Sequence, residues 1–364
     1  MNPHYRAALP VRLYESESSA DTVAARFGLD PASMVDFSLN INPLGPPRAA
    51  MLAAQAALQG CHQYPDLRLS KLRRALAHRH DVDEDAILFG AGLDDVIKLL
   101  VHALSSEGGA VVVHLPTFPR YELEARLRGA RVVAVENDPP WTVNRVGIEG
   151  LLQREHVELA FLCTPNNPTG EVLDTDWLAS LVARHPDCVF VIDEALIEPR
   201  LSGAWAELRG FANAIVLRTF SKYYGLAGVR IGYAIGPAPL LRLVERGRPP
   251  FNVSHAADAA ALAALDDIEF IDRCTATFES ETGRFRAGLA GMRHVAIRGG
   301  HANMLLLEPA TMPVARVVDA LGAQGCMVAD AACFGGLGGH AAIRISLQDR
   351  AANDRLLDAL RKLG

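Results

Sequence analysis

The most constraining feature of this sequence is an alternation of two patterns that begins near Leu72. Short runs of Val, Ile and Leu alternate with segments whose apolar residues recur at helical spacing. Such runs are typical of strands buried on both faces, so the pattern predicts an α/β fold with a mostly parallel sheet. The expected strands are Ala86–Phe89, Ala110–His114, Arg131–Val135, Leu159–Cys163, Cys188–Ile192, Ala214–Leu217 and Arg230–Ile235, and the helices between them include Asp94–Leu104 and Asp176–His185.

The pattern changes beyond about Pro250, and 364 residues are long for a single core. The helices expected there are Ser254–Leu265, Ile268–Leu289, Val314–Gln324 and Asn353–Leu363, and the strands are His294–Arg298, Asn303–Leu307 and Ala342–Leu347. We therefore expect a large domain over residues 46–248 and a smaller α+β domain over residues 249–364. Residues 1–45 are expected to pack on the small domain, with the stiff turn Pro43–Pro47 as the crossing between domains.

The composition excludes several classes of function. A net charge of −6 and a pI near 6.1 provide no basic field for nucleic acid. The six cysteines have no regular spacing, which indicates free thiols in a reducing compartment. The N-terminus lacks the apolar core of a signal peptide, and no apolar run reaches the roughly 18 residues that span a bilayer. We expect a cytoplasmic protein without a membrane or nucleic-acid partner.

Lys222 closes the run Arg218-Thr219-Phe220-Ser221-Lys222, and Arg230 follows eight residues later. A lysine flanked by hydroxyls can hold an aldehyde cofactor as a Schiff base while Thr219, Ser221 and Arg230 bind a phosphate. Pyridoxal 5'-phosphate carries both groups. An isolated Ser-Lys pair is usually solvated surface, so this hypothesis depends on the rest of the chain.

Asp193 and Asn167 each follow a predicted strand, at the sheet edge where open α/β folds bind ligands. Asp193 can pair with a protonated pyridine nitrogen. Alternatively, it caps the next turn or forms a metal-binding pair with Glu194. Asn167 lies in the turn Thr164–Gly170, where its amide can donate to the cofactor's phenolate oxygen; a plain Pro/Asn turn is the alternative.

Two further turns follow strands of the same sheet. Gly90-Ala91-Gly92-Leu93-Asp94-Asp95 opens a helix whose N-terminal amides favour a phosphate, and Asp95 stands where a dinucleotide fingerprint needs glycine. Phe118 can stack on a pyridine ring or belong to the core. No metal is expected, because His78-Arg79-His80 has no third ligand nearby and is interpreted as a surface cluster at a helix end.

Taken together, these stretches resemble the fold-type I pyridoxal-phosphate enzymes. Within them, the chain resembles the histidinol-phosphate aminotransferase group, and most closely its threonine-phosphate decarboxylase branch. The likeness runs from about residue 35 to the C-terminus and implies an aspartate aminotransferase-like fold with pyridoxal 5'-phosphate as cofactor. It is carried by Asp36–Pro47, Tyr64-Pro65-Asp66, Phe161–Gly170, Asp193-Glu194-Ala195, Ser221-Lys222, Arg230, Arg344-Ile345-Ser346 and Asn353–Leu357.

The resemblance also implies a role for each site residue. Lys222 is the Schiff-base lysine and proton carrier, Asp193 holds the pyridine nitrogen and Asn167 the phenolate oxygen. Phe118 stacks on the ring. The residues implied around the phosphate are Gly92, Leu93, Asp94, Thr219, Ser221 and Arg230. Tyr64 would reach the phosphate from a partner subunit, which implies a homodimer with shared sites. Arg344 would bind the substrate carboxylate, and Asn42 would also contact substrate.

Four departures from the pattern concern the substrate. Phosphate-recognising relatives usually carry arginine where Ala329 stands, and the decarboxylases often have a second arginine in place of Gln348. Their N-terminal His-Gly-Gly element is missing, and the corresponding stretch Leu13–Asp21 contains the carboxylate of Glu15. Leu196 replaces the tyrosine that commonly follows Asp-Glu-Ala in the aminotransferases. These departures predict intact cofactor machinery with an altered distal pocket.

We therefore expect an enzyme that acts on an amino acid as an external aldimine, with α-decarboxylation ranked first, transamination second and side-chain elimination or replacement third. Arg344 and the distal pocket decide which bond breaks, and the sequence does not show that geometry. A non-enzymatic regulator of the same fold is the alternative class, but the residues before Asp36 are too few and too acidic for a helix-turn-helix. Gly335–Gly339 is expected as either a mobile lid or a plain loop.

Overall fold

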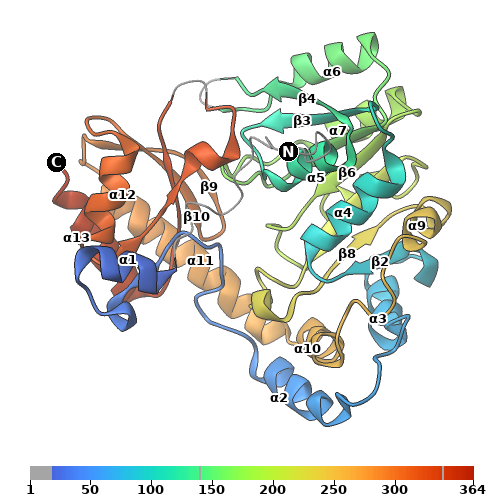
Figure 1. Cartoon of the computed structure of the whole chain (residues 1–364), viewed down its shortest axis with the longest axis horizontal. Coiled ribbons are helices and arrows are strands. Elements are labelled where there is room, and N and C mark those ends of the chain that lie inside the picture. Colours follow the sequence, from blue (N-terminus) through green and yellow to red (C-terminus); the bar gives the residue numbers. More distant parts are fainter. Residues whose placement is uncertain (1–18, 139–140, 338–339) are drawn as a thin grey trace, which may run out of the picture.

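A computed structural model describes residues 19–138, 141–337 and 340–364. A seven-stranded sheet in the order β2-β8-β7-β6-β5-β3-β4 forms its centre (Figure 1). All neighbouring strands pair in parallel except β8, which is antiparallel to β2 and to β7. The strands are β2 (Ile87–Gly90), β3 (Ala110–Leu115), β4 (Arg131–Glu136), β5 (Leu159–Cys163), β6 (Val189–Asp193), β7 (Ala214–Thr219) and β8 (Gly232–Ile235). The predicted mostly parallel sheet is confirmed.

Helices cover both faces of this sheet, because its strands are apolar on both sides. One core cluster joins the sheet to α4 (Leu93–Leu104), α5 (Arg120–Arg128) and α9 (Ala238–Glu245). The opposite cluster holds the remaining helices of this unit. They are α2 (Arg48–Ala57), α3 (Ser70–His80), α6 (Arg145–Arg154), α7 (Thr175–Arg184), α8 (Trp205–Leu208) and α10 (His255–Leu265).

The C-terminal unit is built on a four-stranded antiparallel sheet in the order β12-β13-β10-β9. Its strands are β9 (Val295–His301), β10 (Met304–Pro309), β12 (Ala329–Asp330) and β13 (Ile343–Ser346). Helices α12 (Val314–Gly322) and α13 (Arg350–Arg361) pack with it into a separate core. This is the smaller α+β unit that the sequence predicts.

The described part of the N-terminal segment packs on this smaller unit (Figure 1). Strand β1 (Val35–Asp36) pairs in parallel with β11 (Cys326–Met327). Helix α1 (Ala20–Phe27) contacts α12, and an ion pair of 2.8 Å joins Arg26 to Asp319. Residues 1–18 of the predicted segment, Glu15 among them, lie outside the described residues.

The division between the two units differs from the expected boundary at residues 248 and 249. Helix α10 packs against α2 and belongs to the core of the large sheet. Helix α11 (Ile268–Leu289) is shared, because Phe278 lies in the large core while Phe285 lies in the small one. The composition changes near Pro250, but the alanine-rich face of α10 still packs closely on the large unit. The cores therefore separate within α11.

The turn that carries the chain between the units is held by two glycines with left-handed backbone. Gly45 has φ 68° and Gly225 has φ 64°. A Cβ at Gly225 would lie 2.1 Å from the carbonyl oxygen of Gly45. Because Gly225 N donates to the Lys222 carbonyl at 2.9 Å, this contact ties the crossing segment to the loop that bears Lys222.

We expect Gly225→Ala to lower the free energy of unfolding by more than about 2 kcal/mol, since left-handed backbone costs alanine about 1–2 kcal/mol and the new Cβ adds a clash. Urea unfolding measures the loss. Gly228→Ala is the matched control, because a Cβ there meets no atom within 4 Å. Equal losses in the two variants would contradict the close approach of Gly225 and Gly45.

Candidate active site

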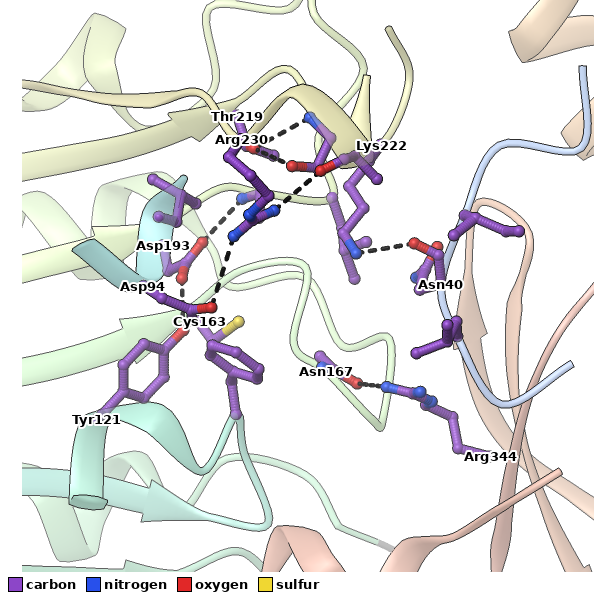
Figure 2. A pocket seen from close by; sticks show the side chains of 18 residues that line it. Asn40, Asp94, Tyr121, Cys163, Asn167, Asp193, Thr219, Lys222, Arg230 and Arg344 are labelled. Atoms are coloured by element: carbon purple, nitrogen blue, oxygen red, sulfur yellow. Dashed lines mark hydrogen bonds and ion pairs between the residues drawn. The ribbon is translucent and has the colours of Figure 1, made fainter. Parts of the chain in front are cut away.

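A cavity of about 260 Å³ lies at the carboxyl ends of β5, β6 and β7, where the large sheet meets β13 and residues 39–41 (Figure 2). The position follows from the topology, since the loops after parallel strands emerge at one sheet edge. Its lining residues are Leu39, Asn40, Ile41, Leu93, Asp94, Phe118, Tyr121, Cys163, Asn167, Asp193, Ala195, Leu196, Thr219, Ser221, Lys222, Ala227, Arg230 and Arg344.

Lys222 presents a buried amine to this cavity. Its Nζ donates to the backbone carbonyl of Asn40 at 2.8 Å. Burial lowers the pKa of Lys222 to about 8, and the positive charges of Arg344 and Arg230 act in the same direction. A much larger fraction of this amine is therefore neutral near pH 7 than of an exposed lysine.

Asp193 ends β6 and is almost fully buried. Its Oδ1 accepts from the backbone amide of Ala195 at 2.9 Å, and its Oδ2 accepts from the hydroxyl of Tyr121 at 2.6 Å. Burial raises the pKa of Asp193, whereas these hydrogen bonds and the charge of Lys222 oppose the rise. The site therefore contains a desolvated carboxylate that would be stabilised by a cationic partner.

Tyr121 was missed by the sequence analysis. It lies in the first turn of α5, three residues after Phe118, and its ring stacks on Phe161 with centroids 4.7 Å apart. Phe118 contacts the same ring edge-on at 5.7 Å and also lines the cavity. The position of Tyr121, three residues after Phe118, was a signal that could have placed the tyrosine in the site.

The two asparagines of the turn after β5 have different surroundings. Asn166 is fully buried, where its amide donates to the Pro116 carbonyl at 3.0 Å and its Oδ1 accepts from Thr117 at 2.7 Å. Asn167 faces the cavity, and its Oδ1 accepts from Nη1 of Arg344 at 3.2 Å (Figure 2). The first asparagine fixes the turn, so the second is held within reach of a ligand.

Hydroxyls and a guanidinium gather beside the start of α4. Arg230 lies 3.7 Å from Asp94, and the hydroxyl of Thr219 donates to that of Ser221 at 3.0 Å. Gly92 has φ 87°, and a Cβ there would lie 2.3 Å from Nη2 of Arg230. The lack of a side chain at Gly92 thus allows the helix N-terminus and the guanidinium to approach each other, an arrangement that suits a phosphate.

Arg344 lies in β13 and is buried at another part of the cavity wall, away from Arg230 in Figure 2. Its Nη2 donates to the Ser38 carbonyl, and its guanidinium lies 5.1 Å from the centroid of the Phe334 ring. A planar guanidinium held in this way suits a carboxylate.

Two predicted site residues lie elsewhere. Asn42 does not line the cavity, because its amide donates to the Tyr223 carbonyl at 2.9 Å and to Sγ of Cys274 at 3.0 Å. Asn40, two residues earlier, lines the cavity in its place. Tyr64 is 79 % exposed and stacks on Phe251 with centroids 4.6 Å apart, outside the cavity of its own chain.

Three residues that depart from the pattern of the resembled family lie in the described part of the chain: Leu196, Ala329 and Gln348. Leu196 lines the cavity. Ala329 lies in β12 directly opposite Arg344 and is buried. Gln348 donates to the carbonyls of Asp36 and Ser346, each at 3.1 Å. Within the Gly335–Gly339 stretch, positions 338 and 339 lie outside the described residues.

The metal alternatives gain no support. Glu194 points away from Asp193 and forms a buried ion pair of 2.7 Å with Arg218. His80 was expected at the surface, but it is half-buried, and its Nε2 lies 3.0 Å from the hydroxyl of Tyr233. Among the described residues, no three His, Cys, Asp or Glu side chains group as metal ligands would.

Residues 32–360 match the family described as aminotransferase class I and II. A histidinol-phosphate aminotransferase from Symbiobacterium thermophilum is 36 % identical over 90 % of each chain. The solved histidinol-phosphate aminotransferase from Sinorhizobium meliloti, in complex with pyridoxal-5'-phosphate, has a TM-score of 0.83, 24 % identity and coverage of 95 % of each chain. The L-threonine-O-3-phosphate decarboxylase from Porphyromonas gingivalis has a TM-score of 0.76 and 24 % identity, covering 91 % of this chain and 99 % of that one.

The residues of the cavity fit this cofactor. The Lys222 amine, with its lowered pKa, suits the aldehyde of the cofactor. The buried carboxylate of Asp193 suits a pyridinium nitrogen, and the cradle beside Gly92 and Arg230 suits the phosphate. The fold is that of the aspartate aminotransferase-like enzymes. The chain belongs to the class I and II aminotransferase family, and it is a pyridoxal 5'-phosphate-dependent enzyme.

Proposed function

We propose that this protein transfers an amino group between an α-amino acid and a keto acid. One observation carries the proposal: the Lys222 amine, with its lowered pKa, shares a cavity with the carboxylate of Asp193 and the guanidinium of Arg344. When bound, pyridoxal phosphate supplies an aldehyde for amines and a ring that accepts electrons from the bonds at Cα. The remaining chemistry is performed by side chains of this chain.

Lys222 would carry the proton. Because its pKa lies near 8, the amine exists in both protonation states close to neutral pH, which is what a proton carrier requires. The Asn40 carbonyl, 2.8 Å from Nζ, orients the amine within the cavity. A lysine held in this way would accept a proton at Nζ and return it within the cavity.

Asp193 and the polar groups around it would hold the cofactor. The hydrogen bonds from Tyr121 and Ala195 keep a carboxylate directed into the cavity, where it can pair with the pyridine nitrogen. Asn167 would donate to the phenolate oxygen and Phe118 would pack on the ring. Gly92, Leu93, Asp94, Thr219, Ser221 and Arg230 would surround the phosphate.

Arg344 would bind the α-carboxylate of the substrate. A bidentate guanidinium–carboxylate pair fixes two atoms of the substrate, so it sets which bond at Cα faces Lys222. The predicted contact of Asn42 with the substrate is not retained, because its amide donates to the Tyr223 carbonyl and to Sγ of Cys274.

Amino-group transfer is now preferred to the α-decarboxylation that the sequence analysis ranked first. Two curated relatives with more than 30 % identity are named histidinol-phosphate aminotransferases. The likeness to the decarboxylase is a likeness of fold at 24 % identity. Decarboxylation is retained as the second candidate on one observation, which is that Leu196 lines the cavity where the resemblance predicts a tyrosine in aminotransferases.

We also propose that the active protein is a homodimer. Tyr64 is a large aromatic side chain that remains 79 % exposed, as expected for a residue that completes the site of a partner subunit. None of the described helices is both long enough and apolar enough to cross a membrane. A cytoplasmic location stays a prediction.

The pH dependence of cofactor attachment tests Lys222. Because burial lowers its pKa to about 8, the neutral amine increases about tenfold per pH unit below pH 8 and levels off above it. We expect borohydride trapping of pyridoxal phosphate on the apoprotein to follow this curve and to be lost in Lys222→Met. The exposed Lys98→Met is the control. A midpoint near pH 10 would contradict the buried amine.

Tyr121→Phe tests the hydrogen bond to Asp193. Removing a partner of a charged group costs about 1.5–3 kcal/mol, so the Kd for pyridoxal phosphate should rise tenfold or more. Absorbance titration of the apoprotein measures this Kd. Tyr224→Phe is the control, because that hydroxyl contacts Arg79 outside the cavity. An unchanged Kd in Tyr121→Phe would show that the hydroxyl does not support cofactor binding.

Product analysis separates the two candidate reactions. The holoenzyme is incubated with amino acids, histidinol phosphate and threonine phosphate, with and without 2-oxoglutarate as acceptor. Amino-group transfer should give glutamate, and more than one equivalent of carbonyl product per site, only when the acceptor is present, and mass spectrometry detects both. Formation of an amine without the acceptor would instead establish decarboxylation.

A further inference from the structure

The cavity contains few charges for a substrate to use. Arg230 and Asp94 stand beside Thr219 and Ser221, where the cofactor phosphate is proposed. At the other end, Arg344 is the only guanidinium among the described lining residues. The residue opposite it in the sheet, Ala329, contributes no polar side chain. One guanidinium balances a single negative charge, which matches a carboxylate better than a phosphate dianion.

The wall beside Lys222 is apolar. Leu39, Ile41 and Leu196 all line the cavity. Ile41 and Leu196 also line a smaller adjoining space next to Lys222, which is closed by Phe278. Leu39 and Ile41 remain 38 % and 36 % exposed in this chain. Large apolar side chains left open at a cavity are typical of a surface that a ligand covers.

Among the described lining residues, this wall offers no partner for a charged side chain. A phosphate or a second carboxylate placed against Leu39, Ile41 and Leu196 would lose its hydration without gaining hydrogen-bond donors from them. An aliphatic side chain in the same place removes apolar surface from water on both partners.

We propose that the substrate is an α-amino acid with an uncharged, aliphatic side chain that packs against Leu39, Ile41 and Leu196 while its carboxylate pairs with Arg344. The proposal rests on the amino-group transfer proposed above and names the substrate class for it. The proposed substrate differs from histidinol phosphate, the phosphate ester for which the relatives are named. The reason for this difference is the apolar composition of the cavity wall.

A side-chain length series with the holoenzyme tests this. Alanine, 2-aminobutyrate and norvaline are compared by kcat/KM with 2-oxoglutarate as acceptor, alongside aspartate and histidinol phosphate. Each added methylene should raise kcat/KM about threefold to fourfold. Aspartate and histidinol phosphate should lie at least tenfold below norvaline. The dissociation constants of the same compounds, from absorbance titration of the holoenzyme, should follow the same order.

The variant Ile41→Ser tests whether the apolar wall causes the dependence of kcat/KM on side-chain length. It should lower kcat/KM for norvaline by about tenfold and leave alanine within about twofold, because alanine has no side chain long enough to reach the wall. Leu44→Ser is the matched control, since Leu44 is an exposed leucine three residues later that does not line the cavity. It should leave the whole series unchanged.

The outcomes that overturn the proposal are distinct from failure of the proposed reaction. A flat series, or histidinol phosphate as the best substrate, refutes the aliphatic class while leaving amino-group transfer intact. If every compound binds but none yields a carbonyl product, amino-group transfer fails, and the order of the dissociation constants still decides whether the wall selects aliphatic side chains.

Discussion

The site depends on a lysine amine whose pKa is lowered inside a cavity that also holds ionised groups. Desolvation disfavours the ammonium form of Lys222, and the charge of Arg344 adds to this, whereas Asp94 and Asp193 pull in the opposite direction. The balance leaves the pKa of the amine about 8. Burial makes the largest contribution to this lowered pKa and the two guanidinium groups add to it, so near neutral pH the amine has a neutral fraction that an exposed lysine lacks.

This balance is possible because the fold brings distant residues to one edge. Asp193 ends β6, Lys222 follows β7, and the residues around Asn40 arrive from a segment that crosses over from the smaller unit. Residues 182 positions apart in the chain thus share the hydrogen bond between the Lys222 amine and the Asn40 carbonyl. The contact of Gly225 with Gly45 holds this crossing in place, so backbone packing and site chemistry are linked at the same point.

Much of the fold could be predicted from the sequence, since β5 and α11 begin and end where their apolar patterns do. The boundary between the two units could not be predicted. The apolar pattern of α10 indicates that this helix is buried, but it does not indicate against which core the helix packs. In the site, the motifs around Asp193 and Lys222 pointed to a cofactor only in combination, because either one alone is more often part of an ordinary turn or surface. The sequence could not show that Asn40 rather than Asn42 lines the cavity. Tertiary contacts decide this, because the Asn42 amide donates to the Tyr223 carbonyl and to Sγ of Cys274.

The sharing of α11 between the two cores has a mechanical consequence. Its N-terminal half buries Phe270 and Phe278 under the large sheet, and its C-terminal half buries Phe285 and Leu289 in the smaller unit. One continuous helix therefore joins the two cores, and any displacement of the smaller unit would have to bend α11 or break some of these contacts. Arg344 belongs to the smaller unit and Lys222 to the large one, so the shared helix also couples the two sides of the cavity.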